Sequence, residues 1–308
     1  MTEIPPNRLR GYLLLFSGMA LVGTYVALSK PLTVAIPVML LATLRFGIAA
    51  VAMAPWTPAA RGEPPIGAAA WRTLFLQSFF GNFLFSIFML YGVSMTSATA
   101  AGVILSSLPA VVALFSWLFL RERLAPRVWL AVVLAVIGIV ALSLVRTPSD
   151  GSGAPNGGAT LLGNLLVFAC VCCEATYVIL GKRLTESLSA KRISALINLI
   201  GLVLILPFGL WQAARFEFAA LTVPTWLLLV FYSLAASMFA TWLWLTGLKT
   251  VPAGHSGVFT IALPLAAGLV GVVWLGEHFT VVHAFSFACA AAGIGLTAWP
   301  VGAQGPSR

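Results

Sequence analysis

The sequence predicts an all-α polytopic membrane protein with ten transmembrane helices, arranged as two inverted five-helix repeats. Three observations support this fold class: the composition, ten long apolar runs, and a similarity between the two halves of the chain. Of the 308 residues, 60% are apolar and 8% are charged, and the mean hydropathy is +1.03. A soluble domain is about a quarter charged. The composition therefore excludes a soluble enzyme, a DNA-binding domain, a disordered chain and a disulfide scaffold.

Ten apolar runs approach the length of about 20 residues that a helix needs to cross a bilayer. They span 11–29, 34–54, 71–93, 98–120, 126–145, 160–181, 193–211, 224–248, 253–275 and 281–299. The first run follows Arg8 and Arg10 and resembles a signal peptide. It lacks a clear small-residue cleavage site, and it has a counterpart in the second half of the chain, so we expect it to be retained.

The positive charges predict the orientation, because cytoplasmic loops of membrane proteins are enriched in Lys and Arg. If the N-terminus lies inside, thirteen basic residues fall on the inner side, three on the outer side, and Arg45 lies within a span. The net charge of +9 is then a topological signal rather than a sign of nucleic-acid binding. We expect both termini to be cytoplasmic.

The two halves of the chain resemble each other. At an offset of 152 residues, nine of the 20 positions of 11–30 are identical in 163–182, and at an offset of 155 the third to fifth spans match the eighth to tenth. The matches include Gly102/Gly257, Pro109/Pro264 and Glu122/Glu277. Five spans per half is an odd number, so the second half enters the membrane from the opposite side. Inverted repeats are typical of secondary transporters.

The Gly-, Ser- and Pro-rich stretch 146–159 reads as a flexible outer linker. It separates a first repeat, 1–145, from a second repeat, 160–308.

Several motifs resemble the ten-span EamA-type members of the drug/metabolite transporter superfamily. They are GTYVALSK at 23–30, the pair Arg45-Phe46, and LRERL at 120–124 and LGEHF at 275–279, each followed by a glycine (Gly138 and Gly293). Within the superfamily the chain is most similar to the amino-acid exporters of the YddG type, which are associated with aromatic amino acids. The resemblance implies that spans 1–4 and 6–9 line a central cavity and that spans 5 and 10 are peripheral.

Polar residues within the spans predict where that cavity lies, because polar groups in hydrocarbon are costly unless they pair or face water. Ser78, Asn82 and Ser86 recur every four residues on the third span, and Ser233, Ser237 and Thr241 are their counterparts on the eighth. Trp242 adjoins the second stripe, and Ser106 and Thr260 lie on the fourth and ninth spans. We predict that these residues line a substrate pathway. Packing of helices through small residues is the alternative.

Paired helix interruptions are expected on the fourth and ninth spans. Gly102 and Pro109 in the first half match Gly257 and Pro264 in the second. Proline removes a backbone donor and glycine permits bending and close approach. We predict that these four residues act as hinges or gates, with static kinks as the alternative.

Two charges lie deep within predicted spans. Arg45 and Glu174 are able to clamp the carboxylate and ammonium of an amino acid, to pair with each other when the site is empty, or, for Arg45, to serve a structural role. Glu174 is also a candidate proton carrier, and its counterpart in the first repeat is Val22. We include Glu174 among the substrate-binding candidates.

The remaining polar residues of the spans receive simpler interpretations. Glu122 and Glu277 are expected to cap or tie neighbouring helices, and Lys30 and Lys182 to snorkel or to act as gates. His255 and His283 have no evident partner in the sequence. The four cysteines fall within apolar runs and are expected to be small core residues.

The sequence therefore predicts a secondary transporter that exports small amino acids or related metabolites, preferably aromatic or apolar, from the cytoplasm across a bacterial inner membrane. Export of other metabolites or drugs on the same scaffold, and a passive channel, are the alternatives. No catalytic, phosphate-binding or metal-binding motif is evident, so we expect neither enzymatic activity nor a cofactor. The expected partners are a small-molecule substrate and the lipid bilayer, with no nucleic acid, and a monomer is the expected state.

Overall fold

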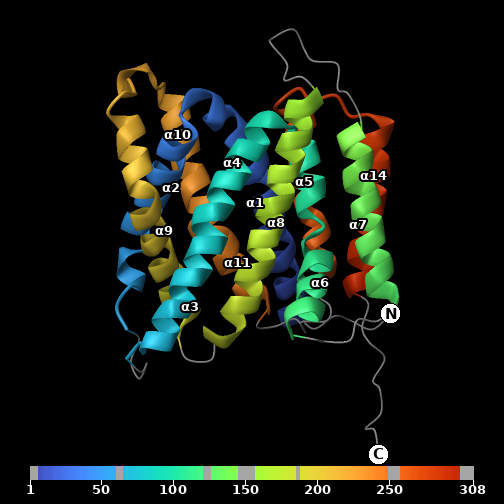
Figure 1. Cartoon of the computed structure of the whole chain (residues 1–308), viewed down its shortest axis with the longest axis horizontal. Coiled ribbons are helices and arrows are strands. Elements are labelled where there is room, and N and C mark those ends of the chain that lie inside the picture. Colours follow the sequence, from blue (N-terminus) through green and yellow to red (C-terminus); the bar gives the residue numbers. More distant parts are fainter. Residues whose placement is uncertain are drawn as a thin grey trace, which may run out of the picture.

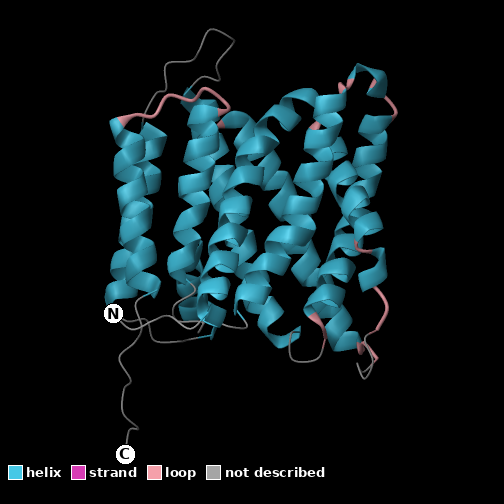
Figure 2. Cartoon of the chain, turned by 180° about the vertical axis from the view of Figure 1, so that it is seen from behind, coloured by secondary structure: helices cyan, strands magenta, loops and turns pink. Residues whose placement is uncertain are grey.

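The computed structural model describes residues 6–59, 65–120, 126–144, 157–184, 188–248 and 257–298. These residues are almost entirely helical and contain no strand. The helices are α1 (Pro6–Ala35), α2 (Val38–Ala52), α3 (Ala68–Ser78), α4 (Phe85–Met95), α5 (Ala98–Leu105), α6 (Leu108–Leu120), α7 (Pro126–Leu144), α8 (Gly157–Leu184), α9 (Ala190–Ala213), α10 (Val223–Leu234), α11 (Ala240–Leu248), α13 (Ala262–Val273) and α14 (Val281–Ala298). They run side by side, and most of the loops gather at the two ends of the bundle (Figures 1 and 2).

The helices correspond to the ten predicted spans. Within the described residues, six helical stretches are long and apolar enough to cross a membrane, and four shorter apolar helices complete the set. Three predicted spans are each divided into two segments. The third span comprises α3 and α4, the fourth comprises α5 and α6, and the eighth comprises α10 and α11. Of the predicted linker 146–159, residues 146–156 lie outside the described residues, and the last three already belong to α8, which begins at Gly157.

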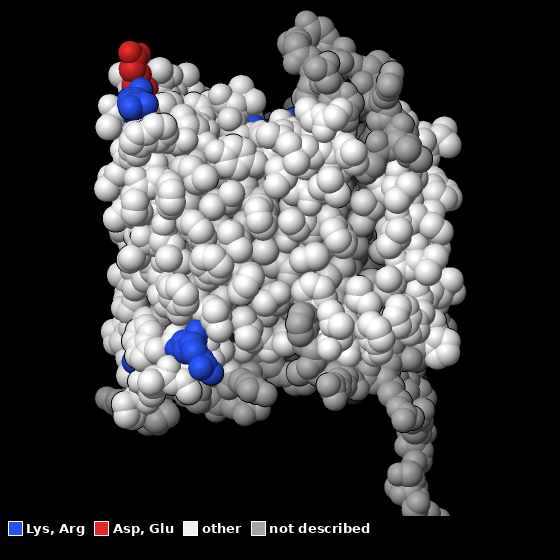
Figure 3. Space-filling model, in the orientation of Figure 1, with Lys and Arg blue, Asp and Glu red and all other residues white. Residues whose placement is uncertain are grey.

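The outside of the bundle is apolar. Leu13, Val203 and Leu269 are each more than half exposed, at 59%, 68% and 65%. The face seen in Figure 3 carries charged side chains only near its two ends, with an uncharged band between them. Such a surface is poorly solvated by water and matches the hydrocarbon of a bilayer.

Helices of one half pack mainly against helices of the other. In the described structure α1 packs against α13 and α11, α8 against α4 and α6, α2 against α9, and α5 against α13. α7 and α14 pack together at one edge of the bundle (Figure 1), as the peripheral placement of the fifth and tenth spans predicts. The two repeats therefore interlock rather than forming separate lobes.

Glycines permit two of these crossings, and the crossings are symmetric. A Cβ added at Gly92 of α4 would lie 3.1 Å from the carbonyl oxygen of Gly163 in α8. A Cβ added at Gly247 of α11 would lie 3.1 Å from the carbonyl oxygen of Gly11 in α1. The two pairs occupy equivalent positions of the repeats. The same small-residue contact is thus made twice, which lets the helix backbones approach closely.

Candidate functional site

The first two residues of the polar stripe on the third span pack against α9. Ser78 and Asn82 both donate hydrogen bonds to the carbonyl oxygen of Ile197, at 2.6 Å and 2.8 Å. Ser78 is completely buried. These contacts join the third span to α9, as the alternative interpretation of helix packing predicts for these two residues.

Ser86 has a different neighbour, although it belongs to the same sequence stripe. Its hydroxyl accepts a hydrogen bond from a terminal nitrogen of Arg45 at 3.2 Å. A π-helical segment, Phe79–Leu84, separates Ser78 from Ser86. Hydrogen bonds in a π-helix join residues five apart rather than four, so the segment rotates the later part of the stripe towards α2.

The eighth span contains the equivalent feature. The π-helical segment Ala235–Phe239 lies between α10 and α11 and includes Ser237. The Ser237 hydroxyl is buried and has no hydrogen-bond partner among the described residues. Ser233 instead donates to the carbonyl of Leu229 in its own helix, at 2.7 Å. π-helical turns are rare in proteins overall, and those that occur are often found at functional sites. The matched pair therefore identifies the third and eighth spans as candidate parts of the functional site.

Two further candidates on α11 lie at different depths. Thr241 is half-buried, whereas Trp242 is 47% exposed and belongs to the apolar outer surface of the described chain.

The fourth and ninth spans are interrupted between their matching Gly and Pro residues. α5 ends at Leu105 and α6 begins at Leu108, which lies between Gly102 and Pro109. In the ninth span a 3-10 helix, Gly257–Ile261, precedes α13, whose first turn contains Pro264. Both interruptions therefore fall where the sequence predicts them. The half-buried Thr260 lies in the second one.

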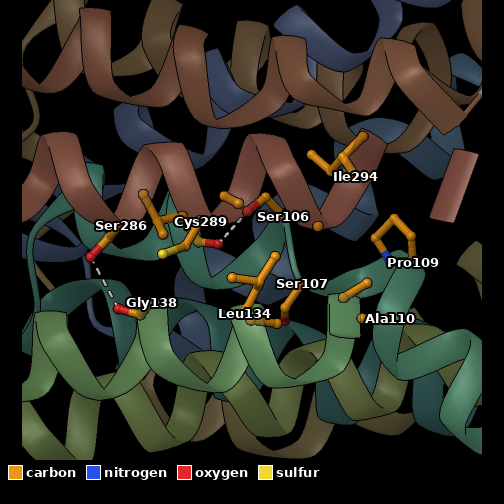
Figure 4. Close-up of a pocket in the computed structure, with 14 residues that line it drawn as sticks. Ser106, Ser107, Pro109, Ala110, Leu134, Gly138, Ser286, Cys289 and Ile294 are labelled. Atoms are coloured by element: carbon orange, nitrogen blue, oxygen red, sulfur yellow. Dashed lines mark hydrogen bonds between the residues drawn. The ribbon is translucent and has the colours of Figure 1, made fainter. Parts of the chain in front are cut away.

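A pocket adjoins the interruption of the fourth span, as Figure 4 shows. It lies between α5, α6, α7 and α14, and Ser106, Ser107, Pro109, Ser286 and Cys289 contribute to its wall. The Ser106 and Ser107 hydroxyls donate to the carbonyls of Val103 and Ile104. Ser286 donates to the carbonyl of Gly138 at 3.1 Å. The pocket is thus lined by satisfied polar groups, and of the predicted substrate-binding residues it includes Ser106.

The centre of the bundle holds the two charges that the sequence places within spans. Arg45 on α2 is 5% exposed, and its Nε has no hydrogen-bond partner among the described residues. Its guanidinium lies 4.7 Å from the ring centre of Phe46 and 5.8 Å from that of Tyr232. The Tyr232 ring in turn meets Tyr25 edge-on at 5.9 Å. We call Tyr25, Arg45, Ser86, Glu174 and Tyr232 the central cluster.

Glu174 joins the central cluster from α8. It is half-buried, and its carboxylate is attracted electrostatically by Arg45. The same carboxylate also interacts electrostatically with the hydroxyl groups of Tyr25 and Tyr177. The described side chains show no direct ion pair between Glu174 and Arg45. Sequence reasoning did not include Tyr25 among the site residues. Its identity with Tyr177 in the repeat alignment was the available signal.

A second polar network closes one end of the bundle. Glu277, in the loop after α13, accepts a hydrogen bond from Lys30 at 3.0 Å, and from the backbone amides of Ala98 and Thr99 at 2.7 Å and 3.0 Å. The Thr99 hydroxyl adds a bond of 2.8 Å. The prediction that Glu277 caps a neighbouring helix is confirmed, because Ala98 begins α5. Burial raises the pKa of Glu277, but Lys30 and the donors from Thr99 and Ala98 outweigh it and bring the pKa below its ordinary value.

The other predicted polar residues divide into described and undescribed ones. His283 does have a partner, since its Nδ1 lies 2.8 Å from the Thr280 hydroxyl. All four cysteines are free thiols, and Cys170 and Cys173 are buried in α8. Glu122 and His255 lie outside the described residues, as does the side chain of Lys182.

Known proteins share this architecture and sequence pattern. The profile of the EamA-like transporter family matches residues 9–144 and 161–299. The uncharacterized transporter YetK of Bacillus subtilis is 36% identical over 292 residues, which cover 94% of this chain and 87% of YetK. An uncharacterized transporter of Archaeoglobus fulgidus is 24% identical over 259 residues, covering 83% of this chain and 86% of that protein.

A solved structure described as "Crystal structure of protein" superposes with a TM-score of 0.62 at 21% identity, covering 93% of this chain and 95% of the other. That similarity concerns the fold. The sequence relationships extend over both halves and both interruptions described above. The chain therefore belongs to the EamA-like transporter family.

Proposed function

We propose that this transporter is a secondary exporter of small amino acids or related metabolites that works by alternating access. The observation that carries the proposal is the symmetric pairing of helix irregularities in the two halves of the chain. The third and eighth spans each contain a π-helical segment, and the fourth and ninth are each interrupted between a Gly and a Pro. Paired interruptions in inverted repeats are the features around which transporters bind and move substrates.

The interruptions give the helices places to bend. Pro109 cannot donate a backbone hydrogen bond, and the residues at 106–107 already bond in shorter turns, with the Ser107 amide donating to Ile104. A segment that is not held by a continuous helical ladder changes direction at lower cost than the middle of a regular helix. In this proposal, Gly102, Pro109, Gly257 and Pro264 are the hinges that open the bundle first to one side and then to the other.

The chemistry of the central cluster favours amino acids with apolar or aromatic side chains. The rings of Phe46 and Tyr232 lie against the guanidinium of Arg45, and the ring of Tyr25 meets that of Tyr232 edge-on. Binding sites for small molecules combine such apolar walls with a few polar groups that fix orientation. The buried Ser237 hydroxyl and the half-buried Thr241 and Thr260 are further candidates for polar contacts to the substrate.

The proposed setting is a bacterial inner membrane with both termini in the cytoplasm. Support comes from the excess of Lys and Arg on one set of loops. Reporter fusions at Ala59 and Ala219, two loop positions expected on opposite sides, test this orientation. Equal reporter activity at both positions would contradict it.

Counterflow in proteoliposomes tests the function. Vesicles preloaded with one unlabelled amino acid are exposed to trace labelled phenylalanine, tryptophan, threonine or lysine, alongside parallel panels of nucleosides and cationic dyes. The proposal expects accelerated, saturable entry of amino acids, with phenylalanine and tryptophan ahead of lysine. Acceleration by nucleosides or dyes alone would assign a different cargo, and non-saturable entry would indicate a channel.

A further inference from the structure

The central cluster contains a buried positive charge with an unused hydrogen-bond donor. Arg45 is 5% exposed, and the described residues give its guanidinium one neutral acceptor, the Ser86 hydroxyl, at 3.2 Å. Its Nε has no acceptor within the described part of the chain. A buried charge is costly unless it is paired and hydrogen-bonded. The Nε of Arg45 is therefore available to donate a hydrogen bond to an anionic group of a bound substrate.

The carboxylate of Glu174 does not supply this missing partner for Arg45. Glu174 attracts Arg45 electrostatically, but the two side chains form no direct ion pair in the described structure. Glu174 also has no hydrogen bond to any described residue. The centre of the bundle therefore presents one positive and one negative group that interact electrostatically and form no ion pair among the described residues.

The two charges come from opposite halves of the molecule. Arg45 lies on α2 of the first repeat and Glu174 on α8 of the second. The position equivalent to Glu174 is Val22, so the arrangement is directional: a ligand bound between the two charges has one defined orientation. Rings of Tyr25 and Tyr232 flank the same region and provide apolar contact area.

We propose that Arg45 binds the carboxylate of an α-amino acid and that Glu174 binds its ammonium group, with the side chain lying against Tyr25 and Tyr232. This assignment rests on the proposed function as an amino-acid exporter, and it names the groups that recognise the backbone of the cargo. A zwitterion pairs with both Arg45 and Glu174 at once. A carboxylic acid or an amine pairs with only one of the two charges. The other charge then stays buried and unpaired, which costs binding free energy.

Competition in the counterflow assay tests the assignment. Labelled phenylalanine is the tracer, and the competitors are unlabelled phenylalanine, phenylalanine amide, which lacks the carboxylate, and 3-phenylpropionate, which lacks the ammonium group. Wild-type protein should prefer phenylalanine over each analogue by about 10-fold or more, the usual effect of one charge-assisted hydrogen bond.

The variants should lose this preference selectively. Arg45→Gln is expected to lower the preference for phenylalanine over the amide while keeping the preference over 3-phenylpropionate. Glu174→Gln is expected to show the reverse pattern. Arg215→Gln and Glu217→Gln, exposed residues in the loop between α9 and α10, are the matched controls and should behave like wild type. Arg45→Lys retains the charge and serves if Arg45→Gln does not fold.

Each result has a definite meaning. Selective loss in the two variants supports the assignment. Wild-type transport of phenylalanine together with unchanged preferences in both variants overturns it and leaves the proposed function intact. Absence of counterflow with every amino acid in folded wild-type protein overturns the proposed function, and this assignment with it.

Discussion

The ammonium group of Lys30 lies 3.0 Å from a carboxylate oxygen of Glu277, a residue 247 positions further along the chain. The bond joins the C-terminal part of α1 to the loop between α13 and α14. The same carboxylate caps the start of α5. One side chain thus connects three helical elements at a single end of the bundle, and the network's charge makes it sensitive to pH.

Glu277 is expected to make stability depend on pH in the acidic range. Its pKa is below the ordinary value in the folded protein. A carboxyl group with a lowered pKa stabilises the fold above its unfolded-state pKa, about 4.3, and this contribution is lost as the pH falls through the folded-state pKa. We expect Glu277→Gln to lower the thermal midpoint at pH 7 and to converge with wild type at acidic pH.

Thermal unfolding in detergent, recorded from pH 7 to about pH 3.5, measures this effect. Charge-assisted hydrogen bonds suggest a loss of about 2 kcal/mol at pH 7. Glu217→Gln is the control, because Glu217 is exposed. A constant difference between wild type and Glu277→Gln at every pH would show that the carboxyl charge does not contribute.

A methyl group at Gly23 should disrupt the crossing of α1 and α13. A Cβ there would overlap the carbonyl oxygen of Leu263 and lie 2.9 Å from the backbone nitrogen of Ala267. Both are backbone atoms, so the helices must separate, and we expect Gly23→Ala to destabilise the protein by about 1–3 kcal/mol. Gly47→Ala is the control, since nothing lies within 4 Å of its Cβ. Equal thermal midpoints for the two variants would refute the close approach.

Ser78 and Ser237 occupy equivalent spans and should respond differently to alanine. Ser78→Ala removes a buried hydrogen bond to Ile197 and should cost about 1 kcal/mol of stability, with KM for counterflow unchanged. Ser237→Ala removes a hydroxyl that has no described partner and should change KM with little effect on the thermal midpoint. The opposite pattern would place Ser78, and not Ser237, at the substrate.

Replacing the prolines should slow transport. Pro109→Ala and Pro264→Ala each supply a backbone donor beside an interruption and favour a continuous helix. We expect the maximal counterflow rate to fall several-fold in each variant while the KM for substrate stays near the wild-type value. Pro224→Ala, at the start of α10, is the control. An increase in KM at constant maximal rate would instead assign these prolines to binding.

Much of the fold is predictable because lipid imposes a simple rule on sequence. The run 193–211, for example, corresponds to α9, Ala190–Ala213. The interruptions were predictable because Gly and Pro have local effects. The π-helical segments were not, since Phe79–Leu84 contains no residue that requires one.

That irregularity also limited the prediction of the site. Sequence periodicity grouped Ser78, Asn82 and Ser86 on one face, but the π-helical segment directs the first two to α9 and the third to Arg45. Periodicity identifies residues that share a face and does not identify the helix opposite. Tyr25 was missed for a related reason, because an aromatic residue in an apolar span looks like lipid-facing or core material until its neighbours are known.

The interlocking of the halves has a consequence for how the two repeats of one chain diverge in sequence. Two identical half-chains inserted in opposite directions would carry every substitution twice, and a carboxylate at the Glu174 position would appear at both symmetry-related places. In the fused chain Val22 occupies the other place. Fusion thus allows the glycine crossings to stay paired while the chemistry at the centre becomes one-sided.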